Sequence, residues 1–406
     1  MPRWILAVLW LCLAQVGMAQ ELKVANRAVQ VHGFFSQGFV YTDRNNWLTM
    51  NTSQGSGAMT DMGLNMSSQL TDKFRVGAQV YDRNLGRLGQ WHPSLDWALA
   101  DYRFANWFGL RAGKVKTTLG LYNDSQDLDF LRVFALLPQG VYPTDVRDAT
   151  IAHVGADLYG NVTLPHHLGE LSYTGYIGHR SDSVYSGYPY LERQWGVWFR
   201  ALGGLQYGAD VRWNTPLKGL LMGASRINQA LTGKGSFVNL LTPAGVVPYE
   251  TSTQTDWANQ FYAEYLHRRL RLDAEYRRFY DSTPYVPGSA VGTDVRAWYA
   301  MGSFRLHKHV EIGSYYSHYT ALNTFGGLAV AFGSATTDTS LPQNHVYDKV
   351  IAGKVDVNRY LYVKLEGHFM DGYAVGAYPN GFYPQQNPHG FQHETRALVV
   401  KTGFKF

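Results

Sequence analysis

The sequence predicts an all-β fold, a 16-stranded antiparallel transmembrane β-barrel with long external loops, short periplasmic turns and an inward-folded third loop. Three observations support it: an export signal at the N-terminus, a two-residue alternation of apolar and polar side chains, and a last strand that ends on Phe406. After residue 19 the chain has no apolar run of the roughly 20 residues that a membrane helix needs. A closed barrel is the other structure that satisfies every backbone polar group in lipid.

The first 19 residues have the three parts of a signal peptide. Arg3 supplies the positive start, residues 5–14 are apolar, and Gly17-Met18-Ala19 has the small-x-small pattern of a cleavage site. The apolar run is shorter than a membrane span, which argues against a permanent anchor. The only cysteine, Cys12, lies in this segment, so the mature chain would have no disulfide or thiol chemistry. We expect cleavage after residue 19, with residues 20–406 forming a single barrel domain.

The composition argues against one class of partner. The chain has 36 basic and 31 acidic residues and a formal net charge of +5, too mild for the concentrated basic face of a nucleic-acid-binding protein. Aromatic residues make up 15% of the chain, and 42 residues are glycine. Many aromatic residues on a polar average suit a lipid-facing wall around a wet lumen. A soluble all-β protein would share this composition. The two ends of the chain and the strand count are therefore what distinguish a membrane barrel from a soluble protein.

Alternation is the main evidence for strands. Apolar residues at every second position of 62–70, apart from Ser68, and of 74–80 flank a short turn and predict a hairpin with one apolar and one polar face. Residues 270–277 and 361–369 repeat the pattern. The polar face would line a lumen and the apolar face would meet lipid.

The connections predict the strand number. Seven short turns are expected at residues 71–73, 105–107, 165–169, 215–219, 268–269, 307–309 and 358–359. Eight longer stretches rich in Gly, Asn, Pro and Ser are expected as loops at residues 43–57, 84–94, 118–149, 181–202, 229–253, 282–293, 320–343 and 372–391. Seven turns and eight loops join 16 strands, the even count of bacterial barrels. Counts of 14 or 18 stay open, because 219–229, 294–305 and 345–356 alternate poorly and 194–214 is either one long strand or a loop and a strand.

The last strand has two distinct faces. Leu398, Val400, Thr402 and Phe404 share one face, and Lys401 belongs to the other. We expect Phe404 and Phe406 to be the signal that the barrel assembly machinery reads in the C-terminal strand. With the N-terminal signal, this predicts a multi-pass protein of a Gram-negative outer membrane, in contact with outer-membrane lipid.

The third long stretch is the candidate for narrowing a lumen. It contains Leu128, Leu131, Val133, Phe134, Leu136 and Leu137, too many apolar side chains for a loop in solvent, so we expect it to fold into the barrel. Fixed charges across a narrow water-filled gap bias which ions pass and orient polar solutes. The candidates for this constriction are Arg111, Lys114, Lys116, Asp124, Asp127, Asp129 and Arg132. The alternative is that these charges pair with one another and only hold the loop in place.

A second group of charged residues lies on the polar face of predicted strands. By parity we expect the lumen wall to carry Arg75, Arg83, Asp101, Arg103, Asp210, Arg212, Arg271, Glu275, Arg277, Lys364 and Glu366.

Three runs carry a resemblance to a known group. Asp101-Tyr102-Arg103, the stretch from Leu110-Arg111-Ala112-Gly113-Lys114 to Leu121-Tyr122-Asn123, and Leu136-Leu137-Pro138-Gln139 resemble bacterial trimeric outer-membrane porins, nearest to the phosphate-selective porin superfamily. The resemblance implies a 16-stranded homotrimer whose third external loop folds inward as a constriction. The specific motif covers roughly residues 95–145. The chain lacks the dense arginine ladder or lysine cluster associated with phosphate selectivity. The resemblance therefore supports the fold and does not support phosphate as the solute.

The sequence predicts passive diffusion of small hydrophilic solutes or ions rather than catalysis. No Gly-x-Ser-x-Gly motif and no P-loop is found, and Asp127 and Asp129 have no partner motif. His389 and His393 have i, i+4 spacing, but Pro388 and Gly390 argue against a helix, so we expect no metal and no cofactor. The alternatives are an outer-membrane barrel enzyme of the phospholipase type and an adhesion or receptor barrel. An energy-coupled receptor would need a plug before the barrel, and alternation begins too early for one.

Overall fold

A computed structural model describes residues 20–24, 27–238, 245–253, 255–286, 289–326, 338–374 and 380–406. Residues 1–19 lie outside the described residues, so the signal peptide and its cleavage stay predictions. Among the described residues, no helix is long and apolar enough to cross a membrane.

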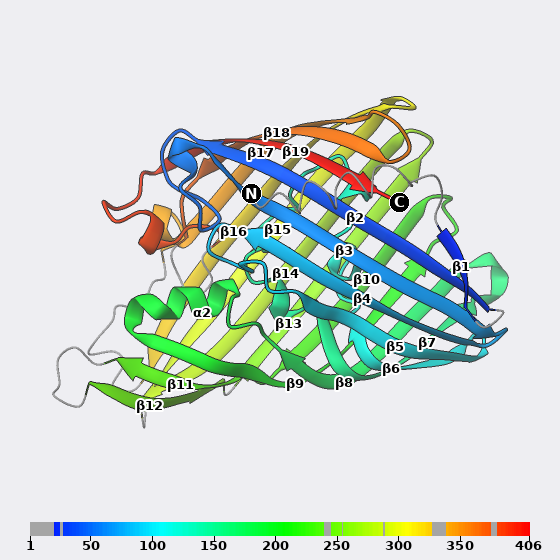
Figure 1. Ribbon diagram of the computed structural model, residues 1–406, viewed down its shortest axis with the longest axis horizontal. Helices are drawn as coiled ribbons and strands as arrows, with labels where there is room; N and C mark the ends of the chain where they lie inside the picture. Colours follow the sequence, from blue (N-terminus) through cyan, green and yellow to red (C-terminus); the bar gives the residue numbers. More distant parts are fainter. Residues whose placement is uncertain are drawn as a thin grey trace.

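The chain forms a closed antiparallel barrel of 16 strands, nine from β2 to β10 and seven from β13 to β19 (Figure 1). The strands are β2 Arg27–Thr42, β3 Ser56–Thr71, β4 Phe74–Leu85, β5 Ser94–Ala105, β6 Phe108–Lys116, β7 Ala152–Thr163, β8 Glu170–Ser181, β9 Val197–Asn214, β10 Leu220–Gln229, β13 Thr255–His267, β14 Leu270–Val286, β15 Ser289–His307, β16 Val310–Gly326, β17 His345–Asp356, β18 Leu361–Asp371 and β19 Glu394–Lys405. Neighbours along the chain pair in antiparallel register, and β10 pairs with β13. The predicted fold class and strand number are confirmed.

Other elements are not part of this ring of strands. They are β1 Gln20–Val24, which pairs with β2, the hairpin β11 Thr232–Val238 and β12 Val246–Ser252, and the helix α2 Gly187–Glu192. Short 3-10 turns span Thr52–Gln54, Asn123–Ser125, Asp129–Leu131, Arg147–Ala149, Pro165–His167, Arg193–Trp195, Pro342–Asn344 and Pro384–Gln386.

The barrel closes where the last strand meets the first. β19 pairs with β2 in a register that sets Phe404 opposite Phe35. Beyond the strand, the Phe406 amide donates to the Gly33 carbonyl at 3.0 Å, and the Gly33 amide donates to the Phe406 carbonyl at 3.1 Å. Closure leaves no free sheet edge in the ring, so every strand can satisfy its backbone groups within the wall.

The alternation of side chains follows the predicted faces. On β18, Leu365 and Phe369 are exposed on the outer wall, whereas Lys364 and Glu366 are buried on the inner face. On β14, Leu272 is exposed outside and Glu275 is buried inside. Because successive strand residues point to opposite faces, this pattern places an apolar surface outside and polar side chains inside.

The connections agree with prediction at one end of the barrel and differ in part at the other. All seven predicted turns lie between paired strands. The predicted loop 282–293 is wrong in extent, because β14 continues to Val286 and β15 starts at Ser289, with pairing as far as the two ends. Pro284 lies beside a register shift, a place where a strand tolerates proline. The predicted loop 229–253 contains the hairpin β11–β12.

The uncertain segment 194–214 contains one long strand. β9 pairs along one edge first with β11, up to Gly203, and then with β10 from Gln206. Between them, a Cβ on Gly204 would lie 2.0 Å from the Ala230 carbonyl oxygen. The two glycines therefore lie where the sheet changes partner, and a larger side chain would block the corner between β10 and β11.

Candidate functional site: the loop-lined lumen

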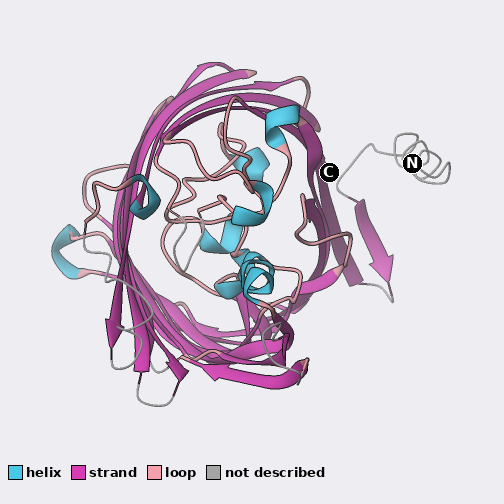
Figure 2. Ribbon diagram, turned by 90° about the vertical axis from the view of Figure 1, so that its left-hand side faces the viewer, coloured by secondary structure: helices cyan, strands magenta, loops and turns pink. Residues whose placement is uncertain are grey.

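The segment 117–151, between β6 and β7, makes hydrogen bonds with inward side chains on several sides of the wall, and Figure 2 shows loops and short helical turns inside the ring of strands. Its two ends are tied together, because the Thr117 amide donates to the Ile151 carbonyl at 3.0 Å and the Asn123 amide group donates to the carbonyls of Thr117 and Thr150. We call this segment the inner loop. Its contacts with strands on several sides of the wall make it the centre of the candidate site.

Apolar burial explains why the inner loop enters the barrel. Its buried side chains join inward tyrosines of the wall in one core, which includes Leu119, Tyr122, Val133, Phe134, Leu136, Tyr142, Tyr299 and Tyr315. The ring of Phe134 packs edge-on against Tyr315 at 5.0 Å between centroids. Leu131 differs from expectation, because it is 53% exposed. Burying a Leu, Val or Phe side chain contributes about 1.5–3 kcal/mol, so the buried apolar residues of the inner loop favour its position inside the barrel.

One polar anchor of the inner loop is Glu275 on β14. Its carboxylate accepts hydrogen bonds from the hydroxyls of Tyr142 and Tyr299, from Gln260, and from the Leu121 amide at 3.2 Å. Two of these donors belong to the inner loop and two to the wall. A buried carboxylate with this many donors keeps a fixed position, so it also fixes the two parts of the inner loop that donate to it.

A second anchor lies on β18. Glu366 accepts from the Ala135 amide at 2.6 Å and the Leu136 amide at 3.3 Å. Lys364 Nζ donates to the carbonyls of Asp129 and Phe134 at 2.6 and 2.7 Å. Both side chains are almost fully buried. Adjacent inward residues of one strand thus bind backbone donors and backbone acceptors of the same turn of the loop.

The charges of the inner loop are paired with wall and loop cations. Asp127 contacts Lys116 at 2.7 Å and Arg147 at 3.0 Å, and Asp96 of β5 contacts the same two cations at 3.4 and 2.7 Å. Burial alone raises the pKa of Asp127, but Arg147 and Lys116 outweigh it and hold the pKa well below the usual range. We call these four residues the charge quartet. It holds two carboxylates and two cations at the root of the inner loop.

Asp129 lies against a row of lysines. Lys364 is directly opposite Lys354 on one side and Lys401 on the other, because of the register of β17, β18 and β19. Asp129 contacts Lys401 at 3.1 Å and Lys364 at 3.6 Å. Burial raises the pKa of Asp129, but these two lysines outweigh it and hold the pKa below the usual range. The sequence showed no lysine cluster, and the strand register creates one.

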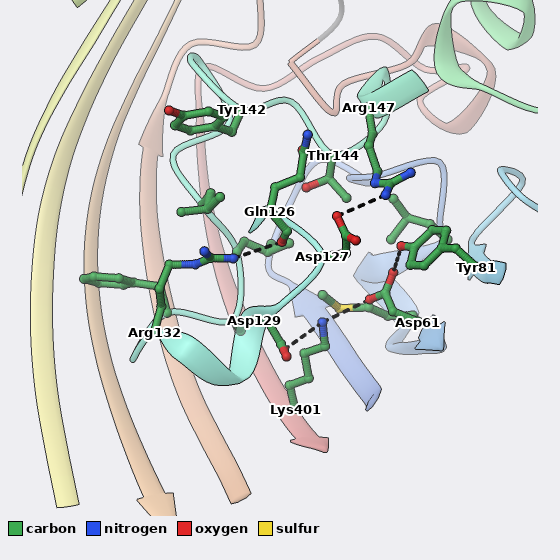
Figure 3. A pocket seen from close by; sticks show the side chains of 16 residues that line it. Asp61, Tyr81, Gln126, Asp127, Asp129, Arg132, Tyr142, Thr144, Arg147 and Lys401 are labelled. Carbon is green, nitrogen blue, oxygen red and sulfur yellow. Dashed lines mark hydrogen bonds and ion pairs between the residues drawn. The ribbon is translucent and has the colours of Figure 1, made fainter. Parts of the chain in front are cut away.

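A small cavity of about 40 Å³ lies between the inner loop and the wall (Figure 3). Asp61, Tyr81, Asp127, Arg147 and Lys401 face it, with Tyr81 donating to Asp61 at 2.6 Å. A cavity of this size has room for roughly three water molecules. The space between this part of the inner loop and the wall is therefore small, and polar groups border it.

The structure places some predicted constriction residues elsewhere. Lys114 pairs with Val154, whose side chain is 53% exposed on the outer wall, and its Nζ donates to the Leu95 carbonyl at 2.7 Å. Lys114 therefore faces outward, which corrects its predicted position. Gly113 precedes it with a φ of +127°, and the next lysine, Lys116, turns inward to the charge quartet.

The remaining constriction candidates have distinct surroundings. Arg111 contacts Asp157 at 3.8 Å and stacks over the ring of Tyr159. Asp124 is half-buried in the turn Asn123–Ser125. Arg132 donates to the carbonyls of Ser125 and Gln126, inside the inner loop itself. Arg132, Asp127 and Asp129 are thus all in contact with groups of the loop or with cations of the wall.

The predicted wall residues divide into two groups. Some touch the inner loop directly: Arg83 donates to the Thr144 carbonyl, Arg212 to the Gly120 carbonyl and Arg277 to the Val141 carbonyl, alongside Glu275, Lys364 and Glu366. Others pair within the wall: Arg75 with Asp101, Asp210 with Arg212, and Arg271 with Asp273. Arg103 is exposed towards the short-turn end. Contacts with the inner loop are therefore made by wall residues from β4 to β18.

Sequence reasoning missed several members of the site. Asp96 lies at a register shift of β4 and β5, where parity fails. Arg147 lies in a loop, where no period applies. Lys401 and Asp61 lie on the inner face of their strands and contact each other, so strict parity along those strands would have found both.

A third set of contacts joins the inner loop to other loops. The Asp145 carboxylate accepts from the Tyr383 hydroxyl at 2.8 Å and the Gly381 amide at 3.3 Å, both in the connection before β19. The Asp145 carbonyl accepts from the Gly187 amide at the start of α2. Burial raises the pKa of Asp145 to about 6, against these hydrogen bonds. Asp145 thus joins three loops at the long-loop end of the barrel.

No family model matches the chain, and no curated protein matches it. Solved structures do. The protein is an outer-membrane-type β-barrel by fold. OmpT of Vibrio cholerae aligns with a TM-score of 0.57 at 11% identity, covering 95% of this chain and 100% of OmpT. The outer membrane channel DcaP of Acinetobacter baumannii gives 0.54 at 9% identity, covering 95% and 99%.

An anion-selective porin from Comamonas acidovorans aligns with a TM-score of 0.53 at 13% identity, over 94% of this chain and 100% of the porin. At these identities the likeness shows the shared fold alone. The in-vitro folded OmpT of Vibrio cholerae is also described in a trimer form. The match to the phosphate-selective superfamily stays a prediction.

Proposed function

We propose that this barrel is an outer-membrane porin that allows small hydrophilic solutes or ions to diffuse through a lumen narrowed by the inner loop. The observation that carries the proposal is the row of charged and polar wall side chains that bind the inner loop inside a closed 16-stranded barrel. A barrel of this strand number is wide enough for an aqueous channel. On this proposal the inner loop narrows the lumen to a polar passage rather than closing it.

The fixed charges support selection by charge. The charge quartet brings two cations and two carboxylates together at the root of the inner loop, and Asp129 contacts two of the aligned lysines, Lys364 and Lys401. In a narrow gap with low-dielectric walls such groups act on a passing ion with little screening. The charge quartet is neutral overall with both signs present, which gives a transverse field rather than a uniform attraction.

Single-channel recording in a planar bilayer tests the function. The purified chain should give stepwise conductance, and deletion of residues 124–132 should raise it, because the deletion removes most of the loop between the two anchors. Lipid hydrolysis without conductance would favour the enzyme alternative instead. A folded barrel with neither activity would favour an adhesion or receptor role. Heat-modifiable mobility on a gel shows that each variant has assembled.

We also propose a homotrimer that contacts through the outer face of β4–β7. Five outward alanines lie side by side there, since Ala78 pairs with Ala98, Ala100 with Ala112 and Ala112 with Ala156. Small side chains let a second wall approach closely. The trimer form of the structurally similar OmpT supports this number of subunits.

Mass measurement in mild detergent tests the assembly. Ala112→Trp should reduce the trimer to monomer, because it adds a large side chain at the centre of the patch. Leu365→Trp, on the outer face of β18, is the matched control and should stay trimeric. A parent protein that is monomeric would contradict the proposal. Export by the signal at residues 1–19 and recognition of Phe404 and Phe406 by the assembly machinery complete the proposed pathway.

A further inference from the structure

Three residues that are far apart in the sequence meet at the long-loop end of the barrel. His345 is the first residue of β17, Asp371 is the last residue of β18, and His393 directly precedes β19. Their side-chain ligand atoms lie within 4.8 Å of one another. Asp371 Oδ1 is 3.6 Å from His345 Nε2 and 3.2 Å from His393 Nδ1. We propose that these three residues form a Zn²⁺-type binding site, separate from the lumen.

The tautomer of His345 favours a metal. Its Nδ1 lies 2.8 Å from the Thr339 carbonyl oxygen, which can only accept, so Nδ1 must carry the proton. Nε2 then presents a lone pair. It is buried and has no hydrogen-bond partner among the described residues, and the side chain is only 4% exposed. A histidine whose other ring nitrogen donates to a backbone carbonyl is the usual arrangement of a zinc ligand.

The local backbone holds the site in place. The Gly372 amide donates to the His393 carbonyl at 2.8 Å, which ties the end of β18 to the segment before β19. Gly372 has a φ of +85°, and a Cβ there would lie 2.2 Å from the His345 carbonyl oxygen. The His345 ring stacks on Tyr347 at 4.3 Å, and Tyr347 stacks on His318 from the other side at 4.4 Å. His345 and Asp371 are therefore oriented before any ligand arrives.

The distances fit a transition metal better than a hard cation. Ligand atoms about 2.0–2.1 Å from a tetrahedral Zn²⁺ lie roughly 3.3 Å apart, close to the two distances that involve Asp371. Two imidazole nitrogens and one carboxylate oxygen are ligands that Zn²⁺ accepts, whereas Ca²⁺ and Mg²⁺ prefer oxygen ligands alone. His393 is 55% exposed in its side chain and can rotate towards the metal. Three protein ligands leave a fourth position open to solvent or to a further ligand.

Zinc titration of the tag-free mature chain in detergent, against a coloured competing chelator, tests the site. The parent should bind one Zn²⁺ per chain with micromolar affinity or better. His345→Ala, His393→Ala and Asp371→Asn should each weaken binding at least tenfold. Co²⁺ should give the intense visible absorption of a tetrahedral site in the parent and lose it in the His345→Ala variant.

His389→Ala is the matched control, because His389 is an exposed histidine of the same connection, four positions before His393. It should bind Zn²⁺ like the parent. The proposal is overturned if the parent binds no Zn²⁺, if His345→Ala binds it as tightly as the parent, or if His389→Ala weakens binding equally. Heat-modifiable mobility confirms that each variant is folded, so loss of binding is separated from loss of the barrel.

Discussion

The Tyr383 hydroxyl donates a hydrogen bond of 2.8 Å to Asp145, and this contact joins the last long connection of the chain to the inner loop. The same carboxylate accepts from the Gly381 amide, and the Asp145 carbonyl accepts from Gly187. Loops from three parts of the sequence therefore depend on one buried acidic group. Its protonation and its removal are both experimentally accessible.

The junction at Asp145 should tighten in acid. Its pKa is raised from 3.8 to about 6 by burial, so the folded junction binds the proton more tightly than a detached loop does. This contribution is fully present below about pH 4 and is lost as the pH rises through about 6. Hydrogen exchange at Gly381, corrected for its intrinsic rate, should slow by up to about 100-fold on acidification.

The Asp145→Asn variant is the control for that pH effect. It keeps an acceptor for Tyr383 but cannot ionise, so its exchange protection should no longer change with pH in this window. Equal pH profiles in parent and variant would show that another group controls the junction.

Lys116 and Lys114 should differ sharply in their effect on ion preference. Lys116→Glu places a negative charge in the charge quartet and should shift the reversal potential in a salt gradient towards cations. Lys114→Glu changes an outward-facing residue and should leave the reversal potential close to that of the parent. A shift by Lys114→Glu as large as that by Lys116→Glu would place Lys114 in the lumen.

Asp127→Asn should shift the channel towards anions. It keeps the shape of the side chain but leaves Lys116 and Arg147 with only Asp96 as a carboxylate partner in the quartet. Removing one partner of a buried ion pair typically costs about 3–5 kcal/mol, so the temperature at which the barrel unfolds in detergent should also fall. Asp338→Asn, at an exposed external position, should change neither quantity.

Gly33→Val should weaken closure of the barrel. A Cβ at Gly33 would lie 2.5 Å from the ring of Phe406, so any side chain displaces the terminal residue. Overpacking of this kind costs about 1–3 kcal/mol, and the gel shift to the unfolded form should occur at a lower temperature. Gly353→Val is the control, since no atom lies within 4 Å of the Cβ position there. Equal shifts in the two variants would disprove the role of the Gly33–Phe406 contact.

The sequence by itself determined the wall of this protein. A strand turns successive side chains to opposite faces, so alternation alone placed Leu365 outside and Lys364 and Glu366 inside. The short turns were found because polar residues interrupt that period locally, with Asn, Pro or Gly in four of the seven turns. The length of the β14–β15 hairpin was not found from the sequence. Pro284 occurs equally well in a loop and at a bulge of a strand, so the sequence did not distinguish the two.

Only the tertiary structure decided what the inward side chains meet. Lys354, Lys364 and Lys401 align because of strand register, which no single strand reveals. Lys114 and Lys116 are two positions apart on β6 in regular register with β7, but Lys116 is the last residue of the strand and its side chain reaches Asp96 and Asp127. His345, Asp371 and His393 meet because the pairing of the neighbouring strands β17, β18 and β19 brings their ends together. Local periodicity sets the face of a residue, whereas its partners depend on long-range pairing.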